Sequence, residues 1–152
     1  MRLWHKDLIP YLPEKQLISQ WRECCAIAKN IATKGTPNHI LVNKVLDYPL
    51  GHFSYYIDLV IREMNKRNYK IKRESYINLI RNLDDAREHF ADGYTDLNTV
   101  IFDGWHNDRY LKQCYYNLQE KFDCGGISLK EWHPIFEEFF RWQITIQDSL
   151  IH

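Results

Sequence analysis

The 152-residue sequence lacks any run of about 18 to 20 apolar residues, the length that a helix needs to span a bilayer. Its start, MRLWHKDLIPYLP, also lacks the apolar block of a signal peptide. We therefore expect a cytoplasmic protein with no membrane partner. Cysteine is scarce, with four residues in the whole chain, and in such a protein we expect reduced thiols rather than a disulfide framework.

The motifs of several well-known enzyme classes are missing too. The sequence contains no glycine-rich phosphate loop, no GxSxG turn, no HExxH and no CxxC. Cys24 and Cys25 are adjacent, so on a helix they would point about 100° apart and chelate a metal poorly. Cys114 and Cys124 are too far apart in the sequence for a zinc knuckle. We therefore expect neither a metal ion nor an organic cofactor.

The charges balance overall, with 20 Lys and Arg against 20 Asp and Glu, but they are unevenly placed. Residues 1–80 carry 13 basic and 7 acidic residues, whereas residues 81–152 carry 7 and 13. Nucleic acid binding needs a local basic face rather than a basic protein, so the first half is compatible with that partner. Chance segregation over solvated helix faces explains the same asymmetry equally well.

Hydrophobic periodicity predicts an all-α fold, a single compact domain of about five to six helices. Apolar residues recur at helical spacing over residues 13–30, 52–67, 74–83 and 108–122, with a short helix expected over 38–46 and an irregular stretch over 84–103. Ser128 and Glu131 form a capping box that opens a last helix. Four aromatic residues on that helix are expected in the core rather than on a surface that stacks bases: Trp132, Phe136, Phe139 and Phe140.

The beginning of the chain offers a candidate nucleophile, the α-amino group of Met1. Groups of this kind have a pKa near 7.7 to 8.0, so roughly a tenth is neutral at pH 7, against less than about a thousandth of an ordinary lysine. An enzyme that forms a Schiff base can use such an amine without burying a lysine. Arg22 and Glu23 lie together on the first long helix, and a carboxylate beside the amine would stabilise a cationic imine.

The segment LPEKQLISQWRECC, residues 12–25, resembles the helix of the pyrimidine-dimer DNA glycosylases, the small all-α phage endonuclease V and its relatives. The corresponding text in that family runs LADQHLMAEYRE, and the spacing from the chain start to Arg22 and Glu23 also matches. The stretch WHNDRYLKQCYYNLQEKFDCGGI, residues 105–127, looks like a bacterial branch of the family, and its NLQEK is similar to the phage RLDEK. The middle of the chain and the last helix match poorly.

This resemblance implies a DNA repair glycosylase with associated AP lyase activity over residues 1–152, acting on damaged double-stranded DNA. The N-terminal amine attacks the anomeric carbon of a nucleotide in a pyrimidine dimer or related lesion, releases the base and leaves a covalent imine, and elimination then nicks the strand. The family's essential glutamate maps onto Glu23, and its phosphate and pocket arginines map onto Arg22 and Arg2. A base flipped out of the stack is also implied. We expect a monomer.

The chain departs from the family pattern at three points. The phage enzyme exposes a threonine once its initiator methionine is removed, whereas Arg2 is too bulky for that removal, so the amine here would be that of Met1. A second arginine of the phage helix falls on Ala26. The acidic second half is also unlike the strongly basic phage protein. The resemblance therefore does not specify the lesion.

Further candidates for DNA binding lie in the basic run after the second predicted helix, where a tyrosine is interleaved as in surfaces that follow phosphates. They are Lys66, Arg67, Lys70, Lys72 and Arg73. A solvated helix end, where basic residues are also favourable, explains the run equally well. The pocket candidates are Trp4 and His5, which follow the amine, and His52 and His106, which adjoin glycine turns. An anchoring role for Trp4 and a surface or capping role for the histidines are the alternatives.

A second function remains open from the sequence, a non-catalytic helical domain that binds nucleic acid or a protein partner on the same scaffold. The placement of Met1 relative to Glu23 distinguishes the two hypotheses. An amine and a carboxylate in one cleft favour the enzyme, and placement on opposite faces favours the binding module.

Overall fold

The computed structural model describes residues 1–151, with the side chains of residues 1–148. Five α-helices follow one another along the chain: α1 (Glu14–Lys34), α2 (Leu50–Lys66), α3 (Arg73–Ala86), α4 (Asp108–Asp123) and α5 (Leu129–Ile151). Three short 3-10 helices connect them: η1 (Lys6–Tyr11), η2 (Asn43–Asp47) and η3 (Arg87–His89). The described residues form no strand, only an isolated bridge between Pro49 and Ala91, so the fold is all-α as predicted.

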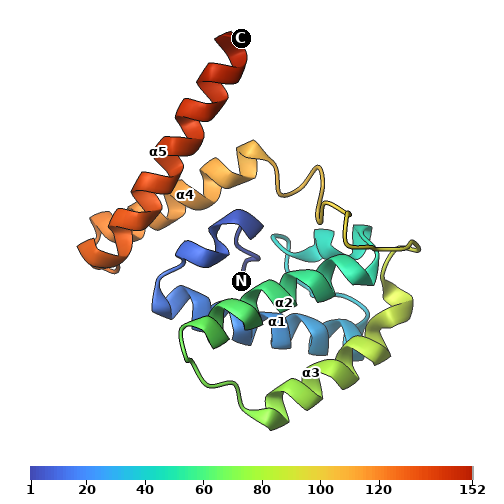
Figure 1. Ribbon diagram of the computed structural model, residues 1–152. Coiled ribbons are helices and arrows are strands. Elements are labelled where there is room, and N and C mark those ends of the chain that lie inside the picture. Colours follow the sequence, from blue (N-terminus) through green and yellow to red (C-terminus); the bar gives the residue numbers. More distant parts are fainter. Residues whose placement is uncertain (152) are drawn as a thin grey trace.

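The helices form two groups around the N-terminal segment (Figure 1). Helix α1 packs against α2 and α3, whereas α4 and α5 form a helical hairpin, and η1 contacts both α2 and α5. A continuous hydrophobic core extends from Leu3 to Phe139 and includes residues of every α-helix, which makes this a single compact domain. The C-terminal part of α5 extends away from the other helices in Figure 1.

The observed helix ends follow local signals in the sequence. Helix α1 begins directly after Pro13 and ends at Gly35, whose φ of 76° is the left-handed conformation that glycine adopts readily. The amide of Glu131 donates to Ser128 Oγ at 3.2 Å, as the capping box predicts. The Glu131 carboxylate also accepts the backbone N–H of Glu14 at 2.9 Å, which ties the start of α5 to the start of α1.

Two expectations about local structure are corrected. The predicted helix over 38–46 is a turn followed by the short η2, because Asn38 (φ 56°) and Val42 (φ −126°) have backbone angles outside the α-helical region at the start and in the middle of the segment. On α5, Trp132 and Phe139 are buried, but Phe136 and Phe140 are exposed. Helix α4 covers the face of α5 that carries Trp132 and Phe139, and Phe136 and Phe140 lie on the uncovered face.

The three candidate histidines, His5, His52 and His106, are buried and serve as hydrogen-bond acceptors for backbone amides. His52 Nδ1 accepts from Phe102 at 3.0 Å, and His106 Nδ1 accepts from Lys6 at 3.0 Å. His5 Nδ1 accepts from the amide of Asp7, inside η1, at 3.1 Å. An unprotonated nitrogen is needed for this role. These histidines therefore hold the chain in place, and none of the three lines the pocket that contains Met1 and Glu23.

We expect the protein to lose stability below about pH 6.5, because the unfolded chain then protonates histidines that the folded protein keeps neutral. Burial, followed by the charges of His5 and Lys6, lowers the pKa of His106 to about 2. Between these two values the unfolded state binds more protons than the folded one, so this residue alone lowers the free energy of unfolding by about 1 kcal/mol between pH 7 and pH 5.5. Burial lowers the pKa of His5 and of His52 in the same direction.

Urea denaturation of the wild type and of His106→Asn at both pH values measures this effect. Asparagine retains an acceptor for the Lys6 amide but does not titrate, so the variant should show a weaker pH dependence. Equal pH dependence in the two proteins would contradict the assignment.

Candidate active site

Met1 and Glu23 line the same pocket, which has a volume of about 380 Å³. The N-terminal segment, α1, the turn before η2 and helix α4 all contribute to it. Three basic residues contribute to its lining: Arg2, Lys15 and Lys121. Among the described residues that line this pocket, Glu23 is the only carboxylate. Such a pocket attracts phosphates around its edge and places one negative charge inside it.

The Glu23 carboxylate lies beside the start of the chain. The backbone N–H of Arg2 donates a hydrogen bond to Glu23 Oε2 at 3.1 Å. The backbone bonds that join the Met1 and Arg2 nitrogens span less than about 4 Å, so the amine lies within about 7 Å of this carboxylate oxygen. The amine and the carboxylate therefore share one cleft and do not lie on opposite faces of the protein.

Gln20, on the buried face of α1, holds the main chain on both sides of Leu3. Its Nε2 donates to the Arg2 carbonyl at 2.9 Å, and its Oε1 accepts from the Trp4 amide at 2.8 Å. The Tyr56 hydroxyl donates to the Trp4 carbonyl at 2.6 Å. Since Gln20 and Glu23 lie about one helical turn apart, a single face of α1 positions the N-terminal segment.

Arg2 and Trp4 lie next to each other in the lining of this pocket. The Arg2 guanidinium lies 5.3 Å from the centre of the Trp4 indole, and its Nη1 donates to Cys114 Sγ at 3.8 Å. Trp4 is buried and also contributes to the pocket lining, so the anchoring and pocket roles considered for it are compatible.

The other predicted basic residues are distributed over three environments. Arg22, Lys70 and Lys72 line a separate groove of about 420 Å³ together with Trp21 and Tyr69. Lys66 and Arg73 are exposed and line neither this groove nor the Met1 pocket. The predicted DNA-binding residues are thus divided between the Met1 pocket, the groove and the exposed surface.

Arg67 is engaged within the protein. Its Nε donates to Glu63 at 2.9 Å, and its Nη1 and Nη2 donate to the carbonyls of Leu12 and Pro10 at 2.7 and 3.0 Å. These contacts tie the end of α2 to the end of η1, a structural role that the charge pattern alone did not reveal.

Comparison with known protein families gives a match for the chain. Residues 1–77, just over half of the sequence, match the family described as pyrimidine dimer DNA glycosylase. The chain belongs to this family. No curated protein and no solved structure gives a significant match. The matched residues include Met1, Gln20 and Glu23, and membership implies a DNA repair glycosylase whose substrate is DNA.

The sequence did not indicate Lys15, Asn117 and Lys121, which line this pocket, or Gln20, which holds the N-terminal segment beside it. For Gln20 the available signal was its position among the apolar residues on the buried face of the first helix. A buried side-chain amide needs hydrogen-bond partners, so such a position indicates a structural contact. Asn117 and Lys121 lie about one turn apart on α4, outside the matched residues. No local pattern indicates that α4 packs beside the start of the chain.

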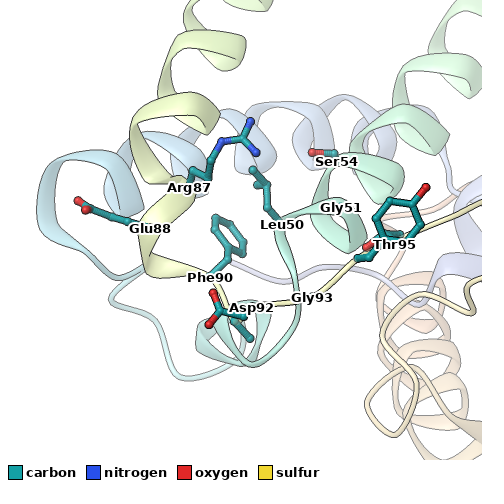
Figure 2. A pocket seen from close by; sticks show the side chains of 11 residues that line it. Leu50, Gly51, Ser54, Arg87, Glu88, Phe90, Asp92, Gly93 and Thr95 are labelled. Atoms are coloured by element: carbon teal, nitrogen blue, oxygen red, sulfur yellow. The ribbon is translucent and has the colours of Figure 1, made fainter.

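A larger hollow of about 460 Å³ lies at the start of α2, away from these residues (Figure 2). Figure 2 shows Arg87 and Asp92 on either side of Phe90, and Glu88 also contributes to the lining. None of the predicted site residues lines this hollow. Because two of its lining residues are acidic, it is less suited to DNA phosphates than the pocket of Met1.

Two further findings concern metal ions and membranes. No group of three or more His, Cys, Asp or Glu within the described part of the chain is placed to hold a metal ion. No helix in that part is long and apolar enough to cross a membrane.

Replacing Gln20 with Met is expected to destabilise the protein by about 2 kcal/mol or more, because it leaves the Trp4 amide and the Arg2 carbonyl buried without a partner. Urea denaturation measures this loss. The Met1 amine should also be held less firmly, so its covalent trapping on DNA should slow under conditions where the variant is folded. Gln113→Met, at an exposed position of α4, is the matched control. Equal behaviour of the two variants would contradict the role of Gln20.

Proposed function

We propose that the chain excises a pyrimidine dimer or a related damaged base from double-stranded DNA and then cuts the strand as an AP lyase. The reaction proceeds through a Schiff base between the Met1 amine and the sugar. Met1 and Glu23 in one pocket, with the Arg2 amide donating to the Glu23 carboxylate, are the observation that carries this proposal. Within the family, we assign the chain to the bacterial branch that residues 105–127 resemble.

In this scheme, the neutral Met1 amine attacks C1′ of the damaged nucleotide. The N-glycosidic bond breaks, and its electron pair leaves with the base, which takes up a proton. The nitrogen gives up one of its protons, and the C1′–O4′ bond then breaks as the nitrogen forms a double bond to C1′. O4′ takes up a proton as the ring opens, which leaves the positive charge on the imine beside Glu23. A fixed carboxylate stabilises that charge in the transition state as well as in the imine, and therefore accelerates the reaction.

Strand cleavage follows from the same imine. The Glu23 carboxylate removes a proton from C2′, and the electron pair of that C–H bond forms a C2′–C3′ double bond as the 3′ phosphate leaves. Water then hydrolyses the imine and restores the free amine. No metal and no organic cofactor take part in this sequence of steps.

The basic residues on both sides of Glu23 support DNA as the substrate. Arg2, Lys15 and Lys121 line the pocket, and Arg22 lines a second groove with Lys70 and Lys72. Phosphate contacts of this kind set the position of a duplex without reading its sequence. Because amine and carboxylate come from one chain, we propose that the protein acts as a monomer.

Borohydride trapping tests this function. The protein is incubated with a panel of lesion-bearing duplexes and an abasic-site duplex in the presence of borohydride, which reduces the imine to a stable amine. We expect a covalent protein–DNA adduct whose peptide map places the link at Met1, and the reactive duplex identifies the lesion. If no duplex of the panel gives an adduct, the catalytic proposal fails.

A further inference from the structure

Two adjacent apolar side chains, Ile40 and Leu41, are exposed on the turn between α1 and η2. Ile40 is 87% exposed and Leu41 is 48% exposed. Single exposed aliphatic residues are common on protein surfaces, but burial stabilises side chains of this size. A partner that covers both would therefore gain their burial on binding.

The turn that presents these two residues is held by hydrogen bonds on both sides of them. The His39 carbonyl accepts from the amides of Val42 and Asn43 at 3.0 and 2.9 Å, and Asn43 Oδ1 accepts from the His39 amide at 2.9 Å. His39 Nδ1 accepts from the Leu41 amide at 3.3 Å. Val42 is fully buried directly after the exposed pair. Hydrogen bonds and the buried Val42 therefore fix the turn on which Ile40 and Leu41 are exposed.

This turn lies at the edge of the candidate active site. Leu41 lines the pocket together with Met1 and Glu23, and the basic residues Arg2 and Lys15 line the same pocket. A sugar bound at the Met1 amine would occupy the same pocket as Leu41, so the bases next to it would come close to the turn. The apolar pair is therefore continuous with the surface that contacts the nucleotide to be excised.

The proposed chemistry requires a nucleotide to leave the base stack, because an amine cannot reach C1′ in closed duplex DNA. Proteins that kink or open DNA insert aliphatic side chains between base steps, where these replace part of the lost stacking. We propose that Ile40 and Leu41 form such a wedge and enter the base stack beside the lesion. This inference rests on the proposed function and adds the element that opens the duplex.

The variant Ile40→Ser tests the wedge by comparing two substrates, because the Ile40 side chain does not line the Met1 pocket. We expect single-turnover base release from a lesion-bearing duplex to fall by about 10-fold or more, since the cost of unstacking is no longer offset. Cleavage of an abasic site in a single-stranded oligonucleotide should stay within about 2-fold of wild type, because no stack has to be opened. The fluorescence increase of 2-aminopurine placed beside the lesion should be lost in the variant.

Leu97→Ser and Val100→Ser provide the matched controls, because these aliphatic residues are 95% and 62% exposed and do not line the Met1 pocket. Both should behave as wild type on both substrates, and melting curves check that all variants are folded. Equal loss by Ile40→Ser on duplex and single-stranded DNA would overturn the wedge, as would full activity on both.

The two proposals fail in different ways. If the wild type forms no covalent adduct with any substrate, the proposed function fails, and the 2-aminopurine signal then decides the wedge alone. A rise with the wild type that Ile40→Ser lacks supports it, and equal signals from the two proteins overturn it.

Discussion

Extending the chain by two residues before Met1 is expected to abolish covalent trapping on lesion-bearing and abasic-site DNA. The extension converts the Met1 nitrogen from an amine into an amide, whose electron pair is delocalised and does not attack C1′. The fold should survive, because Gln20 and Tyr56 hold the main chain of residues 2–4 and not the amine. Borohydride trapping and a melting curve, measured on the same preparation, separate lost chemistry from lost structure.

An extension of equal length after the last residue is the control and should trap DNA as well as the native chain does. Trapping by the N-terminally extended chain at the native rate would exclude the Met1 amine as the nucleophile. A lysine near the pocket, such as Lys15 or Lys121, would then be the candidate to examine.

Glu23→Gln should separate catalysis from binding. Glutamine has nearly the same size, and its carbonyl oxygen still accepts the Arg2 amide, so the N-terminal segment should stay in place. The variant lacks the negative charge that repels phosphates and stabilises the imine. We expect lesion DNA to bind as tightly as to wild type or more tightly, whereas single-turnover base release falls by about two orders of magnitude or more, a loss typical of removing a general acid or base.

Affinity and single-turnover excision have to be measured on the same Glu23→Gln preparation. A carboxylate that only pairs with Arg22 or Lys15 on the helix surface predicts a stability change of a few tenths of a kcal/mol and no kinetic effect. Glu14→Gln, at the exposed start of the same helix, is the matched control and should excise normally. Unchanged excision by Glu23→Gln would contradict its place in the reaction.

Local patterns in the sequence were sufficient to predict the helices. The 3.6-residue spacing of apolar side chains located all five α-helices, and Pro13, Gly35 and the Ser128–Glu131 box marked their ends. These signals act between residues within about one helical turn of each other, so they can be read along the chain. Arg22 and Glu23 were identified in the same way, from a short segment that resembles one family.

Contacts between distant segments were decided only by the tertiary structure. Gln20 binds residues near the chain start, Lys121 of α4 reaches the pocket of Met1, and Arg67 turns inward to carbonyls of the N-terminal segment. His106 likewise looks in the sequence like a polar candidate for the pocket, yet it is buried and holds the amide of Lys6. Charge and polarity describe what a side chain can bind, but its partners depend on how all the helices pack, and that packing is determined by the whole core at once.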